Sequence, residues 1–380
     1  MRTYRPGRAT WTGDGARGDR DPRPDSTARP VAAGLDRVVG LQRLAGNRVV
    51  RQLLGARTRP VVQRKEYGLD EQPRQDRYVD TAVRLWRTQR SMPIGDFVAA
   101  VMTAVQAELT AAGVPLFGWV PVTGAGAAGV FDSAAWKVKV NVAKFTSRLV
   151  PKTLGDLTPA EVTEVVGTLF HESRHADQDV LVIRSLLDQK RTPQQIHAAT
   201  KIRKDVIQAV RATRSATPLD PDQVAHAGRM FDVMYGTHKE LLTFLMAHSA
   251  AVEGIDRLSL PTSRPADAAR HVATLTTWQT SVLRPKLRRM AAAKAPTPVE
   301  TALQQRLAQV DSELTALSAA WRKVAGARRP GADDVDDLRQ AAGDTHAAIT
   351  DAYTHLESEA DAFRVEGEVT TAFAARIATP

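Results

Sequence analysis

Three segments of this 380-residue chain carry the same signal for the start of a helix. Each places threonine at the N-cap, proline at the first helical position and Glu or Gln three residues after the threonine, in Thr158–Glu161, Thr192–Gln195 and Thr297–Glu300. In such a capping box, the two polar side chains satisfy backbone amides that the first turn of a helix leaves open. Aromatic residues make up only 5% of the chain, which disfavours extensive sheets. The chain is therefore predicted to be mainly helical.

One stretch, residues 115–145, has a different pattern. Residues 117–122 are apolar and rich in β-formers, and residues 136–141 alternate between apolar and polar side chains. A period of two is typical of a strand with one buried face. Helical patterns precede this stretch near 77–91 and 94–112, and a last long helix is predicted from Gly331 to about residue 372. The expected fold class is mainly α (α+β), with a small β-sheet before the helix that begins at Thr158.

The N-terminal part of the chain has a composition of its own. Residues 1–75 hold 16 Lys/Arg and 8 Asp/Glu, so they carry +8 of the net charge of +10. We expect residues 1–35 to be a disordered basic leader and residues 36–76 to form an amphipathic helix, at 36–55, with a linker. Residues 77–380 then form the main domain, with a helical insertion at about 190–330. A basic leader could bind nucleic acid, but a solvated tail is the preferred interpretation, so nucleic acid is an unlikely partner.

The chain contains no cysteine. This excludes disulfides, thiolate metal sites and a cysteine nucleophile, so any zinc must be held by His, Asp or Glu. No uninterrupted apolar run approaches the length of a membrane span, and the basic N-terminus is not followed by the apolar segment of a secretory signal. The expected location is the cytoplasm of the producing cell.

The strongest chemical motif is His171-Glu172-Ser173-Arg174-His175, on the helix that the first capping box begins. Residues four apart on a helix project from one face, so both imidazoles can bind one metal ion. This is the H-E-x-x-H arrangement, in which the glutamate, here Glu172, is the general base for a zinc-activated water. The sequence predicts a zinc-dependent hydrolase that acts on a peptide or protein substrate.

A catalytic zinc also needs a third protein ligand. We expect Glu357 to be that ligand, with Asp361 one turn later orienting a histidine from the second shell. Tyr353, one turn earlier on the same predicted face, is expected to stabilise the oxyanion as a catalytic residue. The rivals for the ligand role are Glu240, His238 and Glu253.

Residues Leu41–Leu54, with the sequence LQRLAGNRVVRQLL, resemble the L-Q-R-x-A-G-N-x-A-V motif. This motif is found in many actinobacterial proteins associated with extracellular contractile injection systems. Val61–Arg64 is similar to the V-Q-R segment that often follows it. The resemblance implies a cargo or effector, such as a toxin, that associates with the injection particle through residues 36–64. Export inside such a particle is the route that the resemblance implies.

Residues His171–Gln178 resemble the H-E-x-x-H-x-x-Q segment of metallopeptidase-like (zincin) domains common in the same systems. The resemblance implies a zincin-like domain in which Gln178 belongs to the second shell of the metal. Glu357 to Asp361 is similar to the E-x-x-x-D segment of CAAX-protease-like zinc peptidases. Those peptidases are membrane proteins, so only the local geometry carries over. Together the resemblances cover under a tenth of the chain.

The sequence also allows two other interpretations. Residues 124–129 match G-x-G-x-x-G, but a dinucleotide site needs a helix at that point, and a strand pattern follows instead. For the protein as a whole, the alternative to an enzyme is a non-catalytic structural or binding protein of the injection particle, with a metal-only or decayed site. The presence of Glu172 favours the enzyme, since a structural metal site has no need of a general base.

Overall fold

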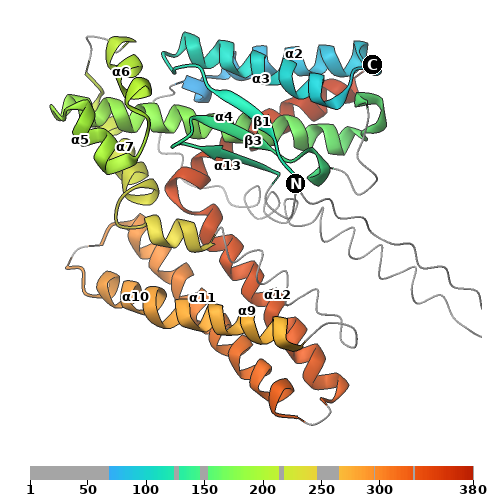
Figure 1. Ribbon diagram of the computed structural model, residues 1–380, viewed down its shortest axis with the longest axis vertical. Coiled ribbons are helices and arrows are strands. Elements are labelled where there is room, and N and C mark those ends of the chain that lie inside the picture. The colour runs from blue at the N-terminus through green and yellow to red at the C-terminus, as the bar shows by residue number, and fades with distance from the viewer. Residues whose placement is uncertain are drawn as a thin grey trace, which may run out of the picture. The chain divides into compact units, whose positions relative to one another are not determined.

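The computed structural model describes residues 68–123, 128–145, 153–213, 218–245, 265–294, 296–327 and 330–379 (Figure 1). All of these residues belong to one compact unit of the chain. The predicted disordered leader, the predicted helix at 36–55 and the rival ligand Glu253 lie outside the described residues, and the predicted domain boundaries stay a prediction.

Helix α4 (Pro159–Asp188) is the longest helix of the first of two hydrophobic cores. It packs against α13 (Glu357–Ala378), α3 (Ile94–Ala111) and α7 (Pro221–Met234), so side chains on most of its surface are buried (Figure 1). The remaining helices of this core are η1 (Gly68–Asp70), α2 (Gln72–Thr88), η3 (Leu154–Asp156), α5 (Pro193–Thr200) and α6 (Lys204–Thr213). A helix surrounded in this way can present polar side chains only to other protein groups.

The predicted small sheet precedes α4 and has three strands. They are β1 (Gly118–Pro121), β2 (Gly129–Asp132) and β3 (Lys137–Val140), followed by the short helix η2 (Val142–Lys144). The order in the sheet is β1-β3-β2, with β1 parallel and β2 antiparallel to β3. Strand β2 is thus an edge strand, and it is the strand that packs on α4 (Figure 1).

The predicted capping boxes are present at the starts of α4, α5 and α11 (Pro298–Gly326). At α4, Thr158 Oγ1 accepts a hydrogen bond from the Glu161 amide at 3.2 Å, and Glu161 Oε2 accepts one from the Thr158 amide at 2.8 Å. A further capping box, with Asp220 and Gln223, starts α7 and was not predicted. Its aspartate replaces the threonine of the other three, and an Asp N-cap is as favourable as a Thr one.

The second hydrophobic core is a set of helices that follow α7. They are α9 (Pro265–Trp278), the π-helical segment η4 (Gln279–Leu283), α10 (Arg284–Ala291), α11 and α12 (Ala332–Thr354). Buried apolar residues recur every three or four positions along α11, at Leu303, Leu307, Val310, Leu314 and Leu317. Helix α12 packs along α11 (Figure 1). The heptad-like spacing of α11 is therefore a packing pattern.

The predicted last helix is broken in two. Helix α12 ends at Thr354, and α13 begins at Glu357 after an extended residue, Leu356. Leu356 is almost fully buried in the second core, whereas Val365 and Val369 of α13 belong to the first core. The break lies where the chain passes from the second core to the first. It also changes which side chains of α12 and α13 share a face.

Among the described residues, α3 is the one helix long and apolar enough to cross a membrane. Its most apolar side chains, including Phe97, Val101 and Val105, lie in the first core. A core helix passes the same test of length and composition, so this is weak evidence for a membrane span.

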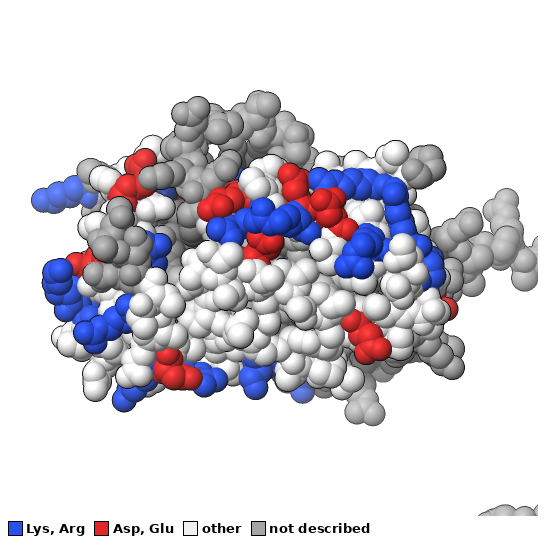
Figure 2. Space-filling view, turned by 90° about the horizontal axis from the view of Figure 1, so that it is seen from above, with Lys and Arg blue, Asp and Glu red and all other residues white. Residues whose placement is uncertain are grey.

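Several charged side chains on the surface of the first core form ion pairs. In the view of Figure 2, positive and negative side chains adjoin in a band beside a broad face with few charges. Ion pairs tie α2 to its neighbours: Arg77 pairs with Glu108 of α3 at 2.6 Å, and Arg376 of α13 pairs with Asp76 at 2.6 Å. Exposed pairs of this kind contribute little to stability.

Candidate metal centre

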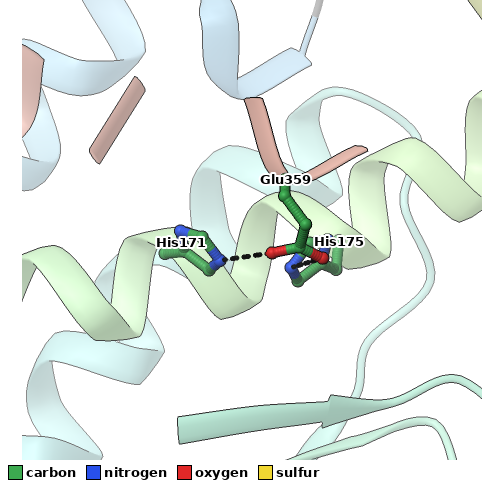
Figure 3. Close-up of side chains that lie close together, drawn as sticks. All are labelled: His171, His175 and Glu359. Atoms are coloured by element: carbon green, nitrogen blue, oxygen red, sulfur yellow. Dashed lines mark ion pairs between the residues drawn. The ribbon is translucent and has the colours of Figure 1, made fainter. Parts of the chain in front are cut away.

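Two histidines of α4 and one glutamate of α13 meet in the first core. His171, His175 and Glu359 each offer a ligand atom, and these atoms lie within 4.8 Å of one another (Figure 3). Glu359 Oε2 is 3.6 Å from His171 Nε2, and Glu359 Oε1 is 3.7 Å from His175 Nε2. Two imidazoles and one carboxylate, converging from two helices, form a candidate metal site.

The helix geometry explains how the histidines meet. His171 and His175 are four residues apart in the middle of α4, and their ring centroids are 4.9 Å apart. Glu359 lies in the first turn of α13, which packs along α4. Figure 3 shows its carboxylate between the two rings. The sequence therefore predicted two members of the cluster, and the packing of α13 provides the third.

A second set of groups orients the histidine rings. His175 Nδ1 is 2.8 Å from Gln178 Oε1, and the amide nitrogen of Gln178 donates to the Ser358 carbonyl and to Asp361 Oδ2. Because an amide oxygen only accepts, Nδ1 of His175 must donate, which leaves Nε2 as the acceptor that faces Glu359. Gln178 thus has the second-shell position that the sequence resemblance implied.

Glu366 has the corresponding place beside His171. Its Oε2 is 3.1 Å from His171 Nδ1. A carboxylate on Nδ1 fixes the tautomer and increases the basicity of Nε2, as in the carboxylate–histidine pairs of metal sites. Glu366 is seven residues after Glu359, two turns along the same face of α13, but the sequence offered no reason to select it.

The charges of the cluster are coupled. Burial acts to lower the pKa of His171, but the carboxylates of Glu359 and Glu366 hold it well above its ordinary value. Burial acts to raise the pKa of Glu359, and the two histidines outweigh it and hold the pKa below the ordinary value. Without a cation, the cluster therefore favours an ionised carboxylate beside a protonated imidazole. A bound cation would take the place of that proton.

The donor set fits a transition metal. Glu359 Oε2 is buried, and the His171 Nε2 that it faces at 3.6 Å is too far away for a strong hydrogen bond. A buried carboxylate oxygen that is poorly paired is costly unless a cation binds it. Two histidines and one carboxylate suit zinc with an open position, and the same set also suits Fe²⁺. The cluster is therefore a candidate site for a metal ion of either kind.

Glu172 lies beside the histidines and faces the sheet. Its Oε2 accepts a hydrogen bond of 2.6 Å from the backbone amide of Phe131 in β2. Burial raises the pKa of Glu172, and the charges of His171 and His175 oppose that shift. Gly129 of β2 also touches Glu172, since a Cβ at this glycine would lie 2.7 Å from Glu172 Cγ. Strand β2 therefore approaches the helix closely at the glutamate.

Tyr353, near the end of α12, is close to the cluster. Burial and the charge of Glu359 raise the pKa of Tyr353 well above its ordinary value. Its ring is 6.3 Å from that of Phe363, and the Phe363 ring is 4.6 Å from that of His171. The structure thus brings Tyr353 near the third member of the cluster, although α12 and not α13 carries it.

The structure places Glu357 elsewhere, which corrects the expected third ligand. Glu357 Oε1 is 2.9 Å from His226 Nδ1 and 3.2 Å from Arg229 Nε, both on α7. Glu359 follows two residues later, about 200° around the helix, and faces the histidines instead. The prediction assumed one unbroken helix through Tyr353, and the break at Leu356 invalidates that assumption. Residues 351–360 contain neither glycine nor proline, so the sequence carried no signal for the break.

Asp361 takes part in a buried hydrogen-bond network. It accepts hydrogen bonds from Arg174 Nε at 2.9 Å and from Gln178 Nε2 at 3.0 Å. Burial opposes ionisation, but Arg174 holds the pKa of Asp361 far below its ordinary value. Asp361 therefore acts on His175 through the amide of Gln178, one group further away than the sequence predicted.

The described rivals for the ligand role lie away from the cluster. Burial and the charge of Lys286 lower the pKa of His238, and Lys286 of α10 donates to the neighbouring Thr237 carbonyl at 3.1 Å. Glu240 is exposed. Neither belongs to the group of possible ligands that the described residues form.

Comparison with protein-family models, with curated proteins and with solved structures gave no significant match. The fold and the cluster therefore define this protein only as a mainly helical protein with a candidate His-His-Glu metal centre. The similarities to zincins and to injection-system proteins rest on short sequence motifs alone.

Proposed function

We propose that this protein is a zinc-dependent hydrolase whose substrate is a peptide or protein. One observation carries the proposal: His171 and His175 both present Nε2 to Glu359, with each Nδ1 held by a second-shell group. Glu172 follows His171 directly and is buried beside the cluster, the position that the H-E-x-x-H motif gives to its general base.

The chain's own residues support a hydrolytic role. Bound zinc would supply a Lewis acid that polarises a carbonyl and acidifies a water molecule. Glu172 would accept the proton of the attacking water and deliver it to the leaving nitrogen, and its raised pKa suits a group that must do both. Tyr353, with an O–H that stays protonated, would donate a hydrogen bond to the oxyanion.

Strand β2 supports an extended peptide as the substrate. The Phe131 amide donates to Glu172 and not to β3, so the outer edge of β2 faces α4 at the general base. An extended peptide can add to the edge of a strand by main-chain hydrogen bonds. Such a peptide would take over the Phe131 amide from Glu172 and lie across the general base, with a carbonyl near the histidines.

A second function is favoured by the burial of the site. His171 and Glu359 are both under a tenth exposed, and Glu172 is already bonded to the strand. A closed ligand set is typical of structural metal sites, which need no open position. The alternative is therefore a metal-only site in a structural or binding protein.

Hydrolysis of a peptide mixture by the zinc-loaded protein and by Glu172→Gln separates the two functions. We expect the unmodified protein to cleave peptides and the variant to keep its zinc while losing activity by about 10²–10⁴-fold, the usual contribution of a general base. If the unmodified protein held zinc firmly and cleaved nothing, the metal-only function would replace the hydrolase.

A partner is proposed from the leader alone. The resemblance at Leu41–Leu54 supports association of residues 36–64 with a contractile injection particle, with the protein as its cargo. Co-purification with particles from the producing cell should require residues 36–64. Equal recovery of a protein that lacks them would contradict this proposal without affecting the hydrolase.

A further inference from the structure

Strand β2 is held against α4 at the general base. Among the described residues, β3 is its one strand partner, and its other edge faces α4. The Phe131 amide donates to Glu172 Oε2 at 2.6 Å. A Cβ at Gly129 would lie 2.7 Å from both Glu172 Cγ and Thr168 Cγ2, so this close approach needs a glycine. The strand therefore occupies the carboxylate that the proposed hydrolysis requires.

A second contact holds the turn that follows β2. Ser133, directly after the strand, donates a hydrogen bond to the carboxylate of Asp179, which also accepts one from the Tyr235 hydroxyl. Asp179 is fully buried on α4, and Tyr235 lies just after α7. Ser133, Asp179 and Tyr235 thus form a clasp between the hairpin of β2 and β3 and two helices of the first core.

The two contacts lie on either side of a metal-ligand candidate. Glu172, His175 and Asp179 are spaced three and four residues apart, so they share one face of α4. The hairpin contacts the first and the last of them and therefore runs along the face that carries His175. His171 and Glu359 are each under a tenth exposed. An extended peptide cannot reach the cluster from this face while the hairpin remains on α4.

The apolar packing of β2 is shared with its own sheet. The ring centroid of Phe131 is 5.7 Å from that of Phe117 and 5.2 Å from that of Trp136. Phe117 directly precedes β1 and Trp136 directly precedes β3. Separation of the sheet from α4 would therefore keep these ring contacts and break the hydrogen bonds to the helix.

We propose that β2 is an autoinhibitory strap, which the clasp keeps closed over the general base and the His175 side of the metal cluster. Substrate binding then requires β2 to separate from α4, which frees the Glu172 carboxylate and the Phe131 amide together. A binding-competent form that is seldom populated lowers the apparent affinity by its fraction, so a weaker clasp increases activity. This inference rests on the proposed hydrolase function and adds its regulation.

The clasp can be weakened at a residue outside the metal cluster. Ser133→Ala removes one hydrogen bond to Asp179. Ser318→Ala, in the second core, is the matched control, since it removes a hydroxyl that lies 3.2 Å from Thr276 Oγ1. Native-state hydrogen exchange of the full chain measures opening at the Phe131 amide. We expect Ser133→Ala to speed this exchange by about fivefold, the usual worth of one hydrogen bond, and Ser318→Ala to leave it unchanged.

Access to the cluster is measured by the association rate of N-acetyl-leucine hydroxamate with the Co²⁺-loaded protein, followed by the visible spectrum of the metal. This rate, and kcat/KM for peptide hydrolysis by the zinc-loaded protein, should rise by the same factor in Ser133→Ala. The loss of a merely structural contact would raise neither.

Equal association rates in Ser133→Ala and the unmodified protein would overturn the strap, and the hydrolase would still stand if peptides are cleaved. Faster association in the variant, without peptide cleavage by either protein, would support the strap and overturn the hydrolase. A hydroxamate that binds neither protein would overturn both.

Discussion

The two hydrophobic cores bury different kinds of side chain. Along α4 the first core buries a run of ionisable residues that includes His171, Glu172, Arg174, Asp177 and Asp179. The second core is lined by leucine, valine and alanine, and α11 buries no charged residue among those described. Burying charge costs free energy that an apolar core of the same size avoids. The difference teaches that packing by itself, which accounts for the apolar side chains of the second core, does not account for the charges of α4.

The largest expected effect on stability comes from Arg174, which is fully buried and bridges Asp177 and Asp361. Arg174→Met should lower the free energy of unfolding by about 3–5 kcal/mol, because it removes the buried cation that two buried carboxylates share. Arg229→Met is the matched control, since Arg229 is 41% exposed in its pair with Glu357. Chemical denaturation should show a loss of under about 1 kcal/mol for the control. Similar losses for both variants would break the comparison between buried and surface charges.

The next largest expected effect is a dependence of the free energy of unfolding on pH, which Asp179 produces. Its pKa is raised from 3.8 to about 6 in the folded protein, so the folded state binds the proton more tightly than the unfolded state. The resulting stabilisation is complete below about pH 4 and is lost as the pH rises through about 6, by up to about 3 kcal/mol. Denaturation of the metal-free protein between pH 4 and pH 7.5 measures it. Asp179→Asn should flatten this part of the profile, and an unchanged profile would remove Asp179 as its source.

A smaller effect, on zinc affinity, is expected from the carboxylate that orients His171. Glu366→Gln keeps an acceptor for His171 Nδ1 but removes the charge, so zinc affinity should fall by about 10–100-fold. Competition with a chelating dye measures this affinity. Glu368→Gln, on the same helix and 41% exposed, should leave the affinity unchanged. Equal affinities for all three proteins would show that Glu366 is not part of the site.

The smallest expected effect is a loss of unfolding free energy from a substitution in the second core. Gln279 is a buried polar side chain of this core and donates to the Asp311 carboxylate at 2.7 Å and to Thr315 Oγ1 at 2.9 Å. Gln279→Ala should cost about 1 kcal/mol of unfolding free energy, since the Asp311 carboxylate is 27% exposed and water can replace the lost donor, and should not alter zinc affinity. A change in zinc affinity would show that the two cores are coupled through the joint at Leu356.

The sequence predicted local features of the fold well. Capping boxes and alternation depend on neighbouring residues, so the starts of α4, α5 and α11 and the strand that precedes α4 could be predicted directly. His171, Glu172 and His175 could be grouped for the same reason, since one helix carries all three.

The rest of the site depends on contacts between distant segments. Glu359 and Glu366 contact α4 although they lie about 190 residues later in the chain. Leu356 packs into the second core, and this packing fixes where their helix, α13, begins. A helix broken by packing, without glycine or proline, leaves no mark in the local sequence. The prediction of Glu357 as the third ligand was wrong for this reason, although the predicted segment does carry the ligand candidate, Glu359.

The zinc content of the purified full chain, beside that of Glu359→Ala and Glu357→Ala, tests the central claim most directly. The two substitutions remove the same group two residues apart, so they differ in position and not in chemistry. The account predicts about one zinc per chain in the unmodified protein and in Glu357→Ala, with loss of zinc in Glu359→Ala. Zinc that is lost in Glu357→Ala and kept in Glu359→Ala would contradict the metal centre described for this fold.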